Sequence, residues 1–184
     1  MHVTTTPPPT VRWVRRLEEL EPLDDVVDAA AATAGRLFGD GARGRVLRGE
    51  WFGHALHPAL TDVVIGSWGS ATVLDLVGGE EAAPAARTLV GVGLLAVGPT
   101  AWTGWAEWSA SGRREQRVGV VHVAAVGTAI GAYAGSYLAR RRGRRRLGVA
   151  LGLVGAGAVT AGAFLGGHLA VARGVGSRHP AFAD

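Results

Sequence analysis

The chain contains neither cysteine nor lysine among its 184 residues. Without cysteine it forms no disulfide, no thiolate metal site and no cysteine-ligated iron–sulfur cluster. All of its basic side chains other than histidine are arginines, which occur in short clusters between apolar stretches. That pattern is typical of loops near lipid headgroups rather than of a nucleic-acid-binding stripe. Despite a net charge of +4, we therefore expect no nucleic-acid partner.

Motifs of common enzymes and transporters are also missing from the sequence. It contains no phosphate-binding loop, no protease motif and no nucleophile with a recognisable base nearby. We therefore expect the chain not to be an enzyme by itself. No internal repeat of the kind used for alternating access is present. Alternating strand patterns are lacking too, which argues against an outer-membrane barrel.

Apolar stretches dominate the chain after about residue 58, and the mean hydropathy is +0.21. Four stretches each have close to the roughly 20 residues that cross a hydrocarbon core, at residues 58–76, 86–105, 118–139 and 147–171. Their connections are short, so neighbouring helices are expected to be antiparallel. The sequence predicts an all-α fold, a four-helix transmembrane bundle in a multi-pass protein of the cell membrane, with the lipid bilayer as its surroundings.

The remaining segments flank this bundle. Residues 1–16 include three consecutive prolines and are predicted to be a disordered leader without a signal peptide. Residues 17–50 place leucine and valine on one helical face and acids elsewhere, which predicts a short amphipathic amino-terminal helical segment, interfacial or a cap. The transmembrane domain is assigned to residues 51–173 and a flexible tail to residues 174–184.

Six titratable side chains are predicted to gather at one side of the bilayer. Two histidines precede or begin the first span, a third lies about a turn into the third span, and a fourth lies at the end of the fourth. Because ionisable groups at membrane depth are costly and tend to mark function, we take as candidate ligands His54, His57, Asp62, Glu107, His122 and His168.

Several sequence blocks resemble a bacterial family of four-helix integral membrane proteins known as a domain of unknown function. WFGHALHPALTDVVIGSWGSATVLDLVGG resembles the family's opening block, which usually reads closer to GHPLHP. TGWAEWS resembles a block that commonly reads TGLADW, while RVGVVHVAAV and FLGGHLAVARGVG resemble the blocks of the third and fourth helices. Ala55 stands where the family has proline, and Glu107 where aspartate is usual. Some relatives adjoin a Rieske-type iron–sulfur domain, so the resemblance implies electron transfer with a Rieske-type redox partner.

Three hypotheses follow for the candidate ligands. Imidazoles are axial ligands of haem iron, so haem b is one possible cofactor, with His57, His122 and His168 as its candidate ligands. His122 and His168 come from antiparallel helices at a shared predicted depth, as ligation by two histidines needs. A transition metal ion is another possible cofactor, held by the same histidines with Asp62 or Glu107. Alternatively, the carboxylates hydrogen-bond the imidazoles in a polar packing network within a structural or partner subunit. A homo-oligomer is compatible with all three.

Overall fold

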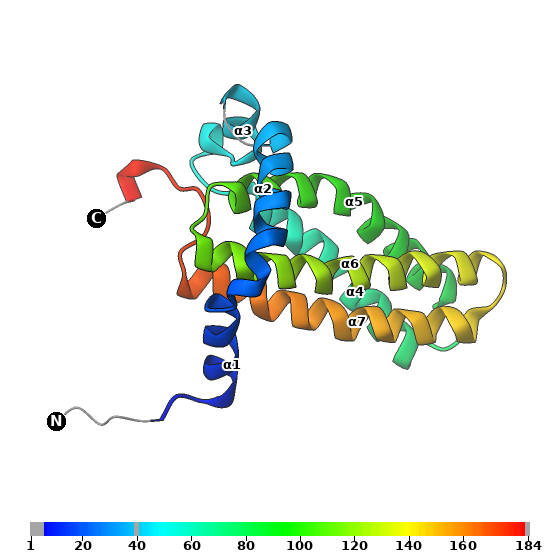
Figure 1. Cartoon of the computed structure of the whole chain (residues 1–184). Helices are drawn as coiled ribbons and strands as arrows, with labels where there is room; N and C mark the ends of the chain where they lie inside the picture. Colours follow the sequence, from blue (N-terminus) through cyan, green and yellow to red (C-terminus); the bar gives the residue numbers. More distant parts are fainter. Residues whose placement is uncertain (1–5, 39–40, 183–184) are drawn as a thin grey trace.

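The structure, a computed structural model, describes residues 6–38 and 41–182 and is almost entirely helical (Figure 1). Its α-helices are α1 (Pro9–Glu18), α2 (Asp24–Phe38), α3 (Gly41–Leu47), α4 (Leu56–Val77), α5 (Ala83–Ser109), α6 (Arg113–Arg141) and α7 (Arg145–Gly167). The last helix continues into a π-helical turn, His168–Ala172. Helices α4 to α7 are each long and apolar enough to cross a membrane. The predicted all-α fold with four membrane-length helices is confirmed.

The four long helices form two antiparallel hairpins that pack face to face. Helix α4 packs mainly against α5, and α6 mainly against α7. The core between the hairpins is aromatic, because Trp68 of α4 stacks on Tyr133 of α6 with ring centroids 4.1 Å apart. Trp68 also donates a 3.3 Å hydrogen bond to the Val90 carbonyl of α5. A Cβ atom at Gly93 would overlap the Trp68 ring, so glycine is required where the indole crosses α5.

The amino-terminal helices form a cap, α1 to α3, at one end of the bundle, and α1 and α2 run across it (Figure 1). Val14 of α1 is buried in one cluster with Val118 and Leu165, while Val27 of α2 is buried in another with Trp108. Much of the leader that was expected to be disordered is therefore helical, since Pro9 begins α1 at a position that suits proline. Residues 1–5 of that leader lie outside the described residues.

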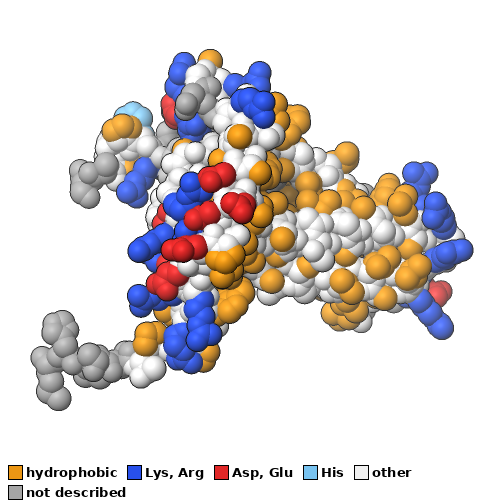
Figure 2. All heavy atoms as spheres, viewed as in Figure 1, with side chains coloured by type: hydrophobic (Ala, Val, Ile, Leu, Met, Phe, Trp, Pro, Cys, Tyr) orange, Lys and Arg blue, Asp and Glu red, His pale blue; other side chains and the backbone are white. Residues whose placement is uncertain are grey.

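Charged side chains are concentrated at the two ends of the bundle, and the surface between them is largely apolar (Figure 2). Helix α6 carries no charged residue other than histidine from Val118 to Ala139. At 1.5 Å per residue this length spans about 32 Å, close to the roughly 30 Å thickness of a hydrocarbon core. We call the slab between the levels of Val118 and Ala139 the apolar layer. Its dimensions fit a bilayer-spanning domain.

A buried ion pair joins the two hairpins at the end opposite the cap. Asp75 of α4 and Arg140 of α6 pair through both carboxylate oxygens, and their side chains are only 5% and 4% exposed. Arg140 also donates to the Ser136 hydroxyl, which in turn donates to the Gly148 carbonyl of α7. The Asp75 carboxylate and the Arg140 guanidinium are thus each paired with a charge on another helix, as burial of charge requires.

Replacing Asp75 by alanine should destabilise the bundle by about 3–5 kcal/mol, because the Arg140 guanidinium would stay buried without a counter-charge. Thermal unfolding in detergent, followed by circular dichroism, measures the effect. Asp25→Ala is the matched control, since Asp25 is exposed on α2. The double variant Asp75→Leu/Arg140→Leu should recover most of the loss. An Asp75→Ala melting temperature equal to that of the control would contradict this role of the pair.

Candidate functional site

Two histidines of the predicted set face the interior from different hairpins. The Nδ1 atom of His57, in the first turn of α4, lies 2.9 Å from the Thr100 carbonyl of α5. The Nδ1 atom of His122 in α6 lies 2.9 Å from the Gly162 carbonyl of α7. A carbonyl oxygen can only accept a hydrogen bond, so each Nδ1 carries the proton and donates it. Each ring is thereby fixed in orientation within its own hairpin.

Glycines make room for both imidazole rings. A Cβ atom at Gly104 would lie 2.8 Å from the Cε1 atom of His57, and one at Gly166 would lie 3.2 Å from the Cε1 atom of His122. Each histidine therefore combines a backbone acceptor on the neighbouring helix with a glycine that allows close approach of the ring. The two hairpins use the same local arrangement.

The two rings lie at one level of the bundle. Thr100 precedes the end of α5 by nine residues, and His122 follows the start of α6 by nine residues, which places both about 13 Å from the cap end. No described residue hydrogen-bonds to the Nε2 atom of either ring. A neutral pair of this tautomer presents two free nitrogen lone pairs from opposite hairpins.

His168 belongs to a separate contact group at the cap. Its Nε2 atom lies 2.7 Å from Oε1 of Glu18, a residue of α1 that is only 3% exposed. Arg173 donates to both oxygens of the same carboxylate, through Nε at 2.6 Å and through Nη2. The register of α6 and α7 places His168 six residues, or about 9 Å, closer to the cap than His122. The three side chains pin α1 to the end of α7.

The Glu18 carboxylate stays charged in this group. Burial raises the pKa of Glu18, but hydrogen bonds from Arg173 and His168, together with their positive charge, outweigh it and hold the pKa below the ordinary glutamate range. Because the pKa is lowered on folding, the group stabilises the docked cap at neutral pH, and that contribution is lost as the pH falls through the lowered value.

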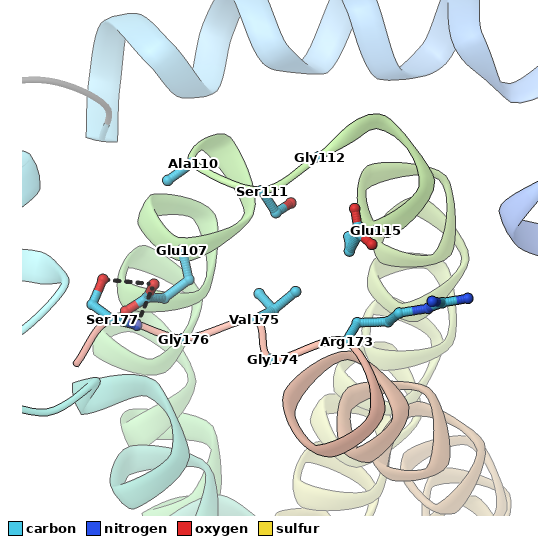
Figure 3. A pocket seen from close by; sticks show the side chains of 10 residues that line it. All are labelled: Glu107, Ala110, Ser111, Gly112, Glu115, Arg173, Gly174, Val175, Gly176 and Ser177. Carbon is cyan, nitrogen blue, oxygen red and sulfur yellow. Dashed lines mark hydrogen bonds between the residues drawn. The ribbon is translucent and has the colours of Figure 1, made fainter. Parts of the chain in front are cut away.

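Glu107 lines a cavity at the carboxyl end of α5. Its Oε2 atom accepts hydrogen bonds from the backbone N–H and the hydroxyl of Ser177, both at 3.0 Å, as Figure 3 shows. Its Oε1 atom is buried without a hydrogen-bond partner among the described residues. The cavity, of about 410 Å³, is also lined by Glu115, Arg173 and residues 174–177. Glu107 therefore holds the tail rather than either histidine of the interior.

The carboxyl-terminal tail is docked along much of its length, although it was expected to be flexible. Besides the contact of Ser177, the His179 amide donates a 2.9 Å hydrogen bond to the Gly53 carbonyl. His54 is exposed in the loop before α4, where its ring stacks on Phe182 with centroids 5.0 Å apart. Residues 183–184 of the predicted tail lie outside the described residues. His54 is thus part of the tail contact.

Asp62 lies on the exposed surface of α4. It follows His57 by five residues, which places it about 7.5 Å deeper in the bundle. Glu107, by contrast, lies seven residues beyond Thr100 on α5, about 10 Å toward the cap. The two carboxylates are therefore separated by about 18 Å along the bundle axis.

The six predicted ligands thus form several contact groups instead of one. Among residues 6–38 and 41–182, no group of three or more histidine, aspartate or glutamate side chains lies close enough to hold a metal ion. The six side chains do not lie at one level of the bilayer, because the four spans do not all start at the same boundary. Helix α4 begins level with Thr100, well inside the end of α5. His57 and His122 are the two candidates that the fold brings to the same level.

Several residues that complete these groups were missed by sequence reasoning. Glu18 and Arg173 were not singled out, because each is one of many charged residues outside the predicted spans. The carbonyl acceptors of Thr100 and Gly162 give no side-chain signal at all. One available signal was a glycine one turn beyond each acceptor, Gly104 and Gly166, since glycine in a helix often marks close approach.

Glu18→Gln should release α1 from the bundle in part at neutral pH, by about 1–3 kcal/mol, since an amide replaces a charged acceptor. A nitroxide on Thr10→Cys, in a chain free of other cysteines, reports the mobility of α1 by electron paramagnetic resonance. In the otherwise unchanged protein, mobility should rise only as the pH falls through the lowered pKa of Glu18. Glu19→Gln, at an exposed neighbour, is the control. Equal mobility in both variants would contradict the assignment.

Comparisons with protein-family models, with curated proteins and with solved structures return no match. The resemblance of the four sequence blocks stays a prediction. The histidine pair is accordingly interpreted from its own contacts and from the chemistry of its donors.

Proposed function

We propose that this multi-pass membrane protein binds haem b through His57 and His122 and acts in electron transfer. The observation that carries the proposal is that both rings donate Nδ1–H to a backbone carbonyl at one level of the bundle. Ligating histidines commonly donate their other ring nitrogen in this way, which fixes the tautomer and orients the ring. The free Nε2 atoms then come from opposite hairpins, and they are the atoms that would hold the haem iron.

The chemistry of the donor set suits haem better than an isolated metal ion. Two neutral imidazoles would suffice to hold haem iron, which would supply one-electron chemistry there. A structural metal ion usually takes four protein ligands and a catalytic zinc ion three, and no such group occurs in the described residues. The chain's own contribution would be to orient the rings, admit them beside Gly104 and Gly166, and exclude water by the surrounding apolar helices.

An electron-transfer role also requires a second redox carrier. The chain has no cysteine, so it cannot itself ligate an iron–sulfur cluster through cysteine. A Rieske-type protein is the partner that the family resemblance implies. The histidine pair lies about 13 Å from the cap end and farther from the opposite end, so a partner docked at the cap would approach the pair most closely.

A structural subunit is the second candidate function, and a specific observation favours it. Each of the three histidines predicted to bind haem already makes a contact that ties two segments together: His57 joins α4 to α5, His122 joins α6 to α7, and His168 joins α7 to α1. A polar network of this kind fixes helix packing without any cofactor. Such a protein would be colourless and well folded.

The absorption spectrum of the purified protein separates the two functions. Cells supplied with haem precursor should give a protein with a Soret band, while His57→Ala and His122→Ala should each retain less than about a tenth of the bound haem, because each removes an axial ligand. His168→Ala is the matched control and should keep the band. All variants are compared by size-exclusion chromatography to establish folding. A folded, colourless parent protein, or loss of the band only in His168→Ala, would contradict haem binding by this pair.

A further inference from the structure

Helix α1 crosses the end of the bundle and continues past the edge of α7 (Figure 1). Its carboxyl-terminal part is docked, because Val14 and Leu17 pack in one cluster with Val118 and Leu165, and Glu18 is paired at the end of α7. Val118 begins the apolar layer, so α1 lies along the boundary of that layer. Since it runs across the bundle axis, α1 is oriented parallel to the surface of a membrane that fills the layer.

The side chains of α1 divide into an apolar face and an arginine face. With 3.6 residues per turn, the apolar residues share one side of the helix: Val11, Val14 and Leu17. The opposite side, which we call the arginine face, consists of Arg12, Arg15 and Arg16. These three side chains are exposed, and none of them forms an ion pair with a residue that the structure describes. Their positive charge is thus available to an anionic partner outside the chain.

The amino-terminal part of the apolar side is not covered by the bundle. Val11 and Trp13 are 45% and 46% exposed. Trp13 packs against Phe164 of α7, with ring centroids 6.2 Å apart, and Phe164 is itself exposed on the outside of the bundle. The next residue, Leu165, contacts Val118 at the start of the apolar layer. The uncovered surface therefore lies where the apolar layer meets its surroundings, which in a membrane are lipids.

We propose that α1 is an interfacial helix that binds the surface of a bilayer containing anionic lipids beside the bundle. Val11 and Trp13 enter the boundary between headgroups and acyl chains, a level that tryptophan prefers. The long side chains of the arginine face reach the lipid phosphates, which guanidinium groups bind through paired hydrogen bonds. The level of the uncovered surface argues for lipid as the occupant, and the unpaired charge argues for an anionic headgroup. The proposal is independent of haem binding.

Electron paramagnetic resonance in vesicles of phosphatidylcholine and phosphatidylglycerol tests where α1 lies, because single nitroxides can be attached to a chain without native cysteine. A nitroxide on Val11→Cys should be relaxed more by oxygen, which partitions into the bilayer, than by a water-soluble nickel chelate. Arg12→Cys, in the arginine face of the same turn, is the matched control and should show the reverse preference. A preference for the nickel chelate at both labels would overturn the proposal, since the apolar side would then face water or a soluble partner.

The lipid charge is tested with the Val11→Cys label in the same assay. Adding phosphatidylglycerol to phosphatidylcholine vesicles should raise the oxygen-to-nickel ratio about twofold or more, because each arginine near an anionic surface favours binding about fivefold. Arg12→Gln/Arg16→Gln should abolish this rise. Arg43→Gln/Arg45→Gln, which removes two exposed arginines of α3, is the control of equal charge and should keep it. A ratio that phosphatidylglycerol does not change in the parent, or equal loss in both double variants, would overturn anionic-lipid binding by the arginine face.

Discussion

The requirement that polar groups inside a lipid layer find partners governs this structure. Within the long helices, polar side chains join one helix to another: His57 bonds a carbonyl of α5, His122 bonds a carbonyl of α7, and Asp75 of α4 pairs with Arg140 of α6. Each contact fixes the register of the helices that it links. Asp62 does not follow this rule: it is exposed on α4, and no described residue makes a hydrogen bond or ion pair with it.

The cap follows the same rule at the membrane surface. Glu18 is buried where α1 crosses the bundle, and two basic side chains from the end of α7 satisfy its carboxylate. Glu107 likewise binds the backbone and hydroxyl of Ser177 and so holds the tail against α5. The histidine pair thus lies beneath an organised polar layer at the cap end of the bundle.

The architecture could be predicted well, because the length and apolar content of each span can be read directly from the sequence. It predicted the depth of the side chains poorly, since depth depends on register. The start of α4 lies level with Thr100, so His57 is deeper, and Asp62 much deeper, than counting from a common boundary indicates. The pairing of Asp75 with Arg140 inside the bundle gives no local sequence signal, because the two residues are 65 positions apart.

Electron paramagnetic resonance of the oxidised, purified protein tests the central claim most directly. Haem iron held by His57 and His122 should give a low-spin ferric signal, because two imidazole ligands produce a strong axial field, and a signal of this kind should vanish when either histidine is replaced by alanine. A haem-loaded protein with only a high-spin ferric signal would contradict ligation by the pair. So would a low-spin signal that survives in the double variant His57→Ala/His122→Ala.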